Sequence, residues 1–215
     1  MLSWRAVLWA LIALVGVAPA AWGNILTARF VDQKGRPIAD ALIVATSASA
    51  PIREGDRKLA VLDQIDKSFV PHVLPVVVGS SVSFPNKDDI RHHVYSFSGA
   101  KTFELPLYKG TPAEPVVFQK PGVVVLGCNI HDFMRGYIGA VESPYFALSG
   151  EDGIARLTDL PPGEYSLTVW HPREKGSGSA PRHLGVEGPF DLDFELHLKP
   201  ALKIRRAPGG RGKRY

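Results

Sequence analysis

A cysteine, a histidine and a methionine stand three residues apart in one short segment of the sequence. Cys128, His131 and Met134 lie in the run GCNIHDFMRG, and Cys128 is the only cysteine of the chain. A histidine pair, His92 and His93, lies upstream. A thiolate, imidazoles and a thioether form the donor set of a copper site with two histidines and a cysteine in a plane and a weak axial methionine. The spacing therefore predicts a type 1 (blue) copper site, whose chemistry is single-electron transfer.

The first 23 residues have the pattern of a secretory signal peptide. Arg5 supplies a positive charge, Ala6–Val17 is an apolar run too short to span a bilayer, and small residues follow at Ala18–Ala20 or Ala21–Gly23. We expect cleavage at one of these sites and export to the periplasm, with no stable membrane span in the mature chain. An uncleaved N-terminal anchor is the alternative.

The expected export to an oxidising compartment affects how the single cysteine is interpreted. Exported chains generally use cysteines in pairs as disulfides, so an odd cysteine indicates a reactive thiol or another use. A metal-bound thiolate would account for Cys128 in an oxidising compartment. A buried, inert cysteine is the alternative.

Charge is unevenly distributed along the chain. Residues 24–198 carry 17 Lys and Arg against 21 Asp and Glu, whereas residues 199–215 carry seven positive charges and no acidic residue. The composition of residues 200–215 predicts a basic, disordered tail, either solvated or in contact with anionic lipid or an acidic partner. Nucleic acid is not expected as a partner, because the body lacks basic residues interleaved with aromatic ones.

The pattern of apolar residues predicts an all-β protein. Short runs rich in Val, Leu, Tyr and Phe are separated by Gly, Pro, Asn and Asp, which is typical of a sandwich or barrel, and no long helical periodicity is present. Lys58–Lys67 fits either a strand or a short helical turn. The expected strands are Leu26–Val31, Ala41–Thr46, Val73–Val78, Ser81–Phe84, His93–Ser98, Val116–Phe118, Val123–Leu126, Tyr137–Val141, Ala155–Leu157, Tyr165–Trp170 and Asp191–Leu198.

Two distant segments resemble parts of one small sandwich. Residues 24–46 resemble the opening hairpin of carboxypeptidase-regulatory-like, or transthyretin-like, sandwiches, and residues 150–170 resemble a later part with the pattern DGxxxLxxLPxGxYxL. Asp152-Gly153 suits a tight hairpin that needs positive φ, and Pro161-Pro162-Gly163 suits a sharp reversal between strands.

Between these segments, the chain resembles cupredoxins of the plastocyanin and amicyanin type. The resemblance runs through Phe69-x-Pro71, Val78-Gly79-x-x-Val82-x-Phe84-x-Asn86, His92-His93-Val94 and Pro121-Gly122-Val123 to the Cys128 loop and Gly136-Tyr137-Ile138. The chain is also similar to exported proteins labelled methylamine utilisation proteins, which resemble cupredoxins followed by a sandwich. Together these resemblances imply a cupredoxin Greek-key β-sandwich plus a small transthyretin/carboxypeptidase-regulatory-like β-sandwich.

The resemblances also imply a division of the chain into domains. We expect a signal peptide at 1–23, the first strands of the small sandwich at 24–56, an inserted cupredoxin domain at 57–142, the remainder of the sandwich at 143–199 and the tail at 200–215. Three consecutive all-β pieces, or one enlarged sandwich, are the alternatives.

The cupredoxin resemblance implies one copper ion with four protein ligands. Cys128 would supply the thiolate, His92 and His131 would complete the trigonal plane, and Met134 would be the axial ligand. The spacing of the last three is similar to the shorter loop of amicyanin. Gly127 and Gly136 bracket this loop, where we expect close backbone approach or a turn.

The choice between the two upstream histidines depends on strand geometry and on the resemblance. The step from Asn86 to His92 matches the cupredoxin pattern, in which the ligand is followed by Asn and Val, but His93 takes the place of that Asn and Arg91 stands where Pro is common. Neighbouring side chains on a strand point to opposite faces, so only one of the pair can face the metal. We expect His92, with His93 as the alternative or as a partner behind the ligands.

For several other polar residues, the sequence predicts a position outside the copper site or leaves two positions open. His72 is either an additional ligand or rim residue, or an exposed histidine at a strand end. Glu104 lies either at the surface or behind a ligand, and Lys87, Asp88 and Asp89 are expected to form a polar turn. The remaining histidines, in the expected small sandwich, are expected to be structural or solvated: His171, His183 and His197.

The donor set favours a periplasmic electron carrier with a redox protein as partner. A copper-binding or delivery protein without an electron-transfer role is one alternative, and a binding module that holds zinc or no metal is another, although methionine is not a usual zinc ligand. An enzyme is not expected. Cys128 and His131 resemble a nucleophile and its base, but no orienting third group, oxyanion loop or paired carboxylates can be identified.

Overall fold

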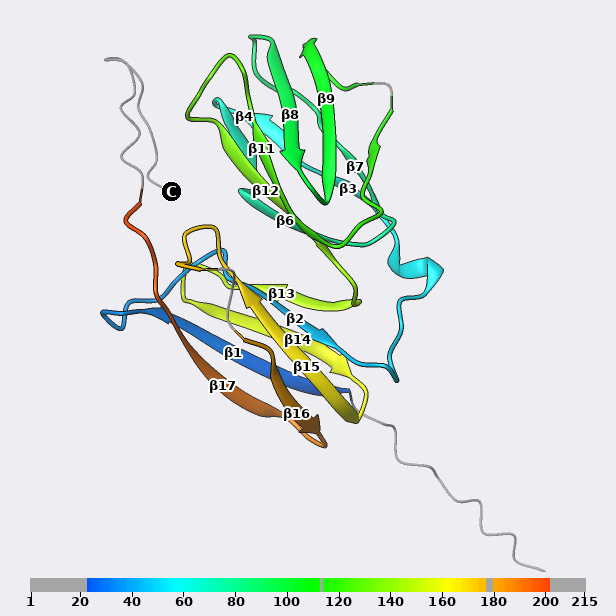
Figure 1. Cartoon of the computed structure of the whole chain (residues 1–215), viewed down its shortest axis with the longest axis vertical. Helices are drawn as coiled ribbons and strands as arrows, with labels where there is room; N and C mark the ends of the chain where they lie inside the picture. The colour runs from blue at the N-terminus through cyan, green and yellow to red at the C-terminus, as the bar shows by residue number, and fades with distance from the viewer. Residues whose placement is uncertain (1–22, 113, 177–179, 202–215) are drawn as a thin grey trace, which may run out of the picture.

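The protein consists almost entirely of β-strands, as the sequence predicts (Figure 1). The computed structural model describes residues 23–112, 114–176 and 180–201. The expected signal peptide, except Gly23, and the expected tail from residue 202 onward lie outside these residues. Within the described ranges, the helical element is the 3₁₀ turn η1 (Glu54–Asp56), and no helix is long and apolar enough to cross a membrane.

One β-sandwich forms the lower half of the molecule in Figure 1. Its core lies between two sheets and includes Phe30, Ile43, Tyr165 and Leu196. The first sheet has the order β14 (Ile154–Leu160), β1 (Asn24–Asp32), β17 (Phe190–Leu196). The second has the order β13 (Tyr145–Leu148), β2 (Leu42–Thr46), β15 (Gly163–Trp170), β16 (Arg182–Val186).

A second sandwich forms the upper half, around a core that includes Leu62, Phe84, Phe118, Leu126 and Ile138. Its larger sheet has the order β6 (Val73–Val77), β12 (Arg135–Val141), β11 (Gly122–Gly127), β8 (His92–Ser98), β9 (Lys101–Tyr108). The smaller sheet has the order β10 (Val116–Val117), β7 (Ser81–Ser83), β3 (Leu59–Val61), and β4 (Asp63–Ile65) forms a hairpin with β5 (Ser68–Val70). The ambiguous segment Lys58–Lys67 thus contains strands β3 and β4.

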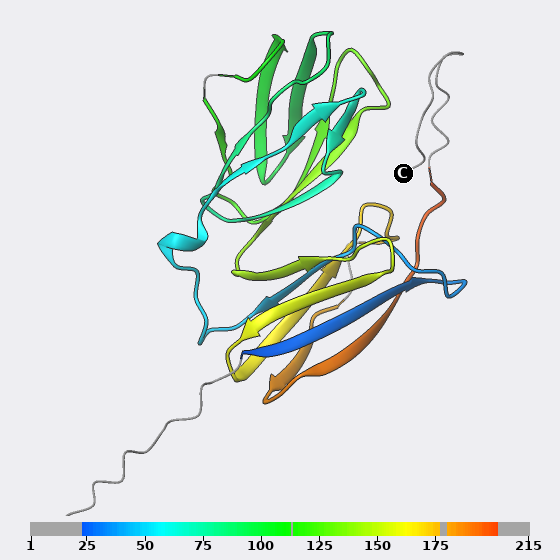
Figure 2. The same ribbon diagram turned by 180° about the vertical axis from the view of Figure 1, so that it is seen from behind.

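The chain enters the upper sandwich after β2, through the segment that carries η1, and leaves it after β12 (Figure 2). Among the described residues, strands β3 to β12 pair only with one another. Strands β2 and β13, which flank them in sequence, pair with each other in the lower sandwich. On this pairing we propose that residues 57–142 are a domain inserted into a second domain, with the boundaries expected from the sequence.

Apolar side chains join the two sandwiches. Leu42 and Val44 of β2 form a separate cluster with Val141 of β12, against which Trp170 packs. Gly139 of β12 makes the close approach possible, because a Cβ there would lie 2.7 Å from the Leu42 side chain. The contact therefore depends on the absence of a side chain at Gly139 of β12, opposite the branched side chain of Leu42 on β2.

A buried histidine lies next to this contact. His171 is 5% exposed, and its Nδ1 accepts a hydrogen bond from the backbone N–H of Arg173 at 3.1 Å. Burial and the positive charge of Arg173 lower the pKa of His171 to about 4, against an opposing effect of the Asp40 carboxylate. The ring is therefore neutral in the folded protein at neutral pH.

We expect the free energy of unfolding to fall as the pH drops from 6.5, the ordinary pKa of histidine, to about 4. In this window the unfolded chain binds a proton at His171 that the folded chain does not, so acid favours unfolding, by at most about 3 kcal/mol. Urea unfolding at several pH values should show a smaller decline for His171→Asn, whose amide oxygen can also accept the Arg173 N–H. Equal declines in both proteins would contradict this account.

Candidate metal centre

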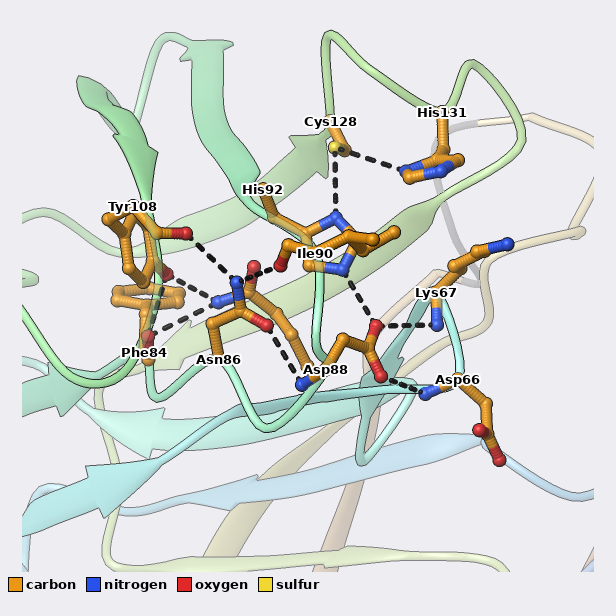
Figure 3. A network of polar contacts seen from close by, with 11 residues as sticks. Asp66, Lys67, Phe84, Asn86, Asp88, Ile90, His92, Tyr108, Cys128 and His131 are labelled. Atoms are coloured by element: carbon orange, nitrogen blue, oxygen red, sulfur yellow. Dashed lines mark hydrogen bonds and ion pairs between the residues drawn. The ribbon is translucent and has the colours of Figure 1, made fainter.

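Three side chains from two distant parts of the chain converge at one end of the upper sandwich (Figure 3). The Cys128 Sγ lies 3.7 Å from the Nδ1 of His92 and 4.0 Å from the Nδ1 of His131. The three donor atoms all lie within 4.8 Å of one another. His92 and Cys128 are buried and His131 is half-buried. The centre is thus closed on the strand side and partly open at the loop.

Strand pairing explains this convergence. Gly127, the last residue of β11, pairs with Tyr95 on β8 and with Arg135 on β12. The end of β11 therefore lies between the starts of β8 and β12, which places Cys128 beside His92. The loop then turns back, because the backbone N–H of Met134 donates to the carbonyl of His131 at 2.8 Å. His131 is held over the thiol by that turn.

Met134 lies in the wall of an open pocket beside the cysteine. The pocket has a volume of about 260 Å³, and Cys128, Met134, Tyr95 and Arg135 are among its lining residues. Met134 is itself buried. The fourth residue expected from the spacing therefore lies in the same pocket wall as Cys128.

The two glycines that bracket the loop both permit close contacts, as expected. A Cβ on Gly127 would lie 2.7 Å from the ring of Tyr95, and a Cβ on Gly136 would lie 2.8 Å from the Cβ of Phe69. Phe69 is a buried residue of the upper core. Any side chain at either glycine would push the loop away from the strands that position its ends.

The structure does not bring His93 or His72 into this group of donors. His93 follows His92 on β8, and its Nε2 lies 2.8 Å from the Oε1 of Glu104 on β9. The Nδ1 of His72 lies 2.8 Å from the Oδ2 of Asp40, so His72 links the two sandwiches. Of the more distant histidines, His171 is buried and structural, while His183 and His197 are exposed.

Asp88, which the sequence assigned only to a polar turn, contacts the centre directly. Its Oδ2 lies 2.7 Å from the Nε2 of His92, the ring nitrogen that faces away from the thiol. Burial raises the pKa of Asp88, but hydrogen bonds with His92 and with the backbone N–H groups of Lys67 and Asp66 outweigh burial and lower it. Asp88 is therefore an ionised carboxylate at neutral pH. A carboxylate four residues before a histidine was the available sequence signal, and it is not a specific one.

His131 has the electrostatic environment of a neutral ligand. Burial lowers the pKa of His131, and the electrostatic effects of the nearby His92 and Lys67 lower it further, against the opposing effect of the Asp88 carboxylate. A neutral imidazole keeps a lone pair for a metal ion. The Nδ1 of His131 faces the thiol, so that lone pair is available at the centre.

The three donors fit one metal ion. An ion bound to sulfur at about 2.3 Å and to nitrogen at about 2.0 Å in a trigonal plane separates sulfur from nitrogen by about 3.7 Å. The separations at Cys128 are 3.7 and 4.0 Å. The donor atoms are thus spaced for shared coordination and do not need a rearranged backbone.

Comparisons with known proteins gave distant structural similarities. No protein-family model and no curated protein matches the chain. An oxidised amicyanin variant is 22% identical over 46% of this chain and 98% of its own, with a TM-score of 0.35. A copper-containing nitrite reductase from Thermus scotoductus SA-01 is 25% identical over 53% of this chain and 28% of its own, with a TM-score of 0.38. A purple cupredoxin from Nitrosopumilus maritimus is 20% identical over 39% of this chain and 99% of its own, with a TM-score of 0.34.

Gly136→Ala tests the close approach of Gly136 to Phe69, which positions the loop that carries Cys128 and His131. The new Cβ would overlap Phe69, and overpacking of this kind costs about 1–3 kcal/mol of stability. Gly99→Ala is the matched control, because a Cβ there meets no atom within 4 Å. We expect chemical unfolding to show a clear loss for Gly136→Ala and little change for Gly99→Ala; similar stabilities for the two variants would contradict the packing described here.

Proposed function

We propose that this chain is an exported type 1 copper protein that carries single electrons between redox partners. The observation that supports the proposal most directly is the convergence of His92 Nδ1, Cys128 Sγ and His131 Nδ1 within 4.8 Å. In this proposal these residues hold one copper ion in a plane, and Met134 is the weak axial ligand. Copper would supply the one-electron redox chemistry.

The donor chemistry favours copper over zinc. Thiolate and imidazole suit both metals, but thioether sulfur is a ligand of copper sites and not a usual ligand of structural zinc sites. Cys128 and His131, which the sequence also raised as a nucleophile and base, lie together with a second imidazole. That arrangement suits metal binding better than nucleophilic catalysis, so the proposed role is transport of electrons and not an enzymatic reaction.

The surroundings of the ligands suit rapid electron transfer. His92 belongs to strand β8 and Cys128 follows strand β11 directly, so both positions are fixed by the paired sheet. A rigid donor set changes little when one electron is gained or lost. The chain's own residues therefore keep the two oxidation states close in geometry.

The half-buried His131 is the proposed point of contact with a redox partner. Its neighbour Ile130 is 51% exposed, and Ile90, in the other loop that leads to a ligand, is 39% exposed. Contiguous patches of exposed apolar side chains mark interaction sites, and the proposed contact surface includes these two residues.

The cellular setting is part of the proposal. The residue pattern of the first 23 residues supports export to the periplasm through a cleaved signal peptide. We also propose a carboxypeptidase-regulatory-like character for the lower sandwich, which rests on the resemblance of residues 24–46 and 150–170. Membership of the methylamine utilisation group rests on the resemblance of the chain to proteins with that label.

Copper loading of the mature protein tests the function. We expect one equivalent of Cu(II) to give an intense visible thiolate-to-copper band and a narrow-hyperfine paramagnetic resonance spectrum. Cys128→Ala and His92→Ala should abolish the band, because each removes an equatorial donor. His93→Asn should keep it, because the His93 side chain contacts Glu104 and not the thiol.

Three outcomes would replace this proposal with another. No thiolate band in the wild-type protein would exclude a type 1 centre. Loss of copper to an acceptor instead of reversible reduction at constant copper content would indicate delivery. Binding of Zn(II) without the copper band, or no metal binding at all, would favour the zinc or metal-free alternative.

A further inference from the structure

The imidazole of His92 connects the thiol to a carboxylate. Its Nδ1 faces Cys128 at 3.7 Å, and its Nε2 lies 2.7 Å from the Oδ2 of Asp88 (Figure 3). A metal ion bound at Nδ1 requires that nitrogen to be free of its proton. The remaining ring proton must then be on Nε2, where it is donated to Asp88.

The Asp88 carboxylate is held in place from the side opposite His92. The backbone N–H of Asp66 donates to its Oδ1 at 2.7 Å, and the N–H of Lys67 donates to its Oδ2 at 2.9 Å. Asp66 and Lys67 form the two-residue turn between β4 and β5, with φ of 50° and 59°. A two-residue turn with positive φ at both positions is of the I′ type. Both of its amides point at the carboxylate.

The loop that carries Asp88 is fixed as well. Asn86 is buried, and its side-chain oxygen accepts the backbone N–H of Asp88 at 3.0 Å. The Asn86 amide group donates to the carbonyl of Ile90 at 2.9 Å. Asp88 therefore meets His92 from a loop that is fixed by hydrogen bonds with Asn86 on both sides of Asp88.

We propose that Asp88 is a positioning residue that fixes the ring proton of His92 on Nε2 and biases the site toward the oxidised ion. The inference rests on the proposed copper function. A carboxylate that accepts the outer N–H of a histidine ligand makes the inner nitrogen a stronger donor. A fixed negative charge close to the site also stabilises the more highly charged ion by more than the less charged one. Both effects favour Cu(II) over Cu(I) and lower the reduction potential.

Asp88→Asn tests the charge while keeping an acceptor of similar shape. We expect the affinity for Cu(II) to fall by about 10- to 100-fold, the range typical of lost partners behind a ligand. The affinity for Cu(I) should fall by less, and the potential should rise by about 59 mV for each tenfold change in their ratio. Competition with chelators of known affinity and protein-film voltammetry measure these quantities.

Two variants separate this role from general effects. Asp89→Asn removes the same charge from the adjacent, exposed residue and should leave the potential near that of the wild type. Asp88→Glu keeps the carboxylate, so its reduction potential should lie closer to that of the wild type than the potential of Asp88→Asn does. Equal potentials for Asp88→Asn and Asp89→Asn, or equal losses of Cu(I) and Cu(II) affinity, would overturn the inference.

A measurement on the wild-type protein remains decisive where a variant does not fold. Nitrogen-15 spectra of the diamagnetic Cu(I) protein should show His92 protonated at Nε2, with a strongly downfield proton that exchanges slowly with water. A proton that exchanges freely would contradict the Asp88 contact even when the thiolate band is present. Absence of that band, in contrast, would remove the copper function itself.

Discussion

A fully buried imidazole with both ring nitrogens occupied is the constraint around which the upper sandwich is arranged. Burial of a polar group is costly unless it has a partner, and His92 has a thiol on one side and a carboxylate on the other. Each partner in turn requires its own support. The thiol needs the end of β11 beside β8, and the carboxylate needs the amides of the β4–β5 turn. Strands β4, β5, β8 and β11 thus meet near one ring.

The carboxylate side and the thiol side of His92 differ in how firmly their groups are held and how exposed they are. On the carboxylate side, backbone amides and the buried Asn86 hold every group in place. On the thiol side, His131 lies half-exposed in a loop bracketed by glycines and followed by Met134. A rigid interior and a more accessible loop are what a site needs if it must hold an ion firmly and still exchange electrons with another protein.

The local parts of the site could be predicted from the sequence because they depend on spacing along one segment. The Cys128 to His131 step and the alternation of His92 and His93 on a strand are properties of short stretches, and the structure places Cys128, His131 and His92 together. The all-β architecture is confirmed, and each expected strand overlaps an observed one. The assignment of these residues as copper ligands remains a prediction.

What the sequence did not reveal depends on contacts between distant segments. Asp88 lies in a polar stretch, and its role appears only when the β4–β5 turn is placed against it. That turn has no glycine, so the usual hairpin signal is missing. Strand β9 was missed because Pro106 interrupts its pattern, which a strand at the sheet edge tolerates. Strands β13 and β16 are short and mixed in character.

The pairing of β1 has a consequence for the order in which the chain matures. Asn24, at the start of β1, bonds to the carbonyl of Leu160, 136 residues later, and the other neighbour of β1 is β17. During synthesis β1 therefore remains without its neighbours until β14 and β17 have been made, whereas the upper sandwich has all its strands by Val141. The upper sandwich can therefore fold first, while the apolar side of β1, with Leu26 and Phe30, has to be shielded from aggregation by other means.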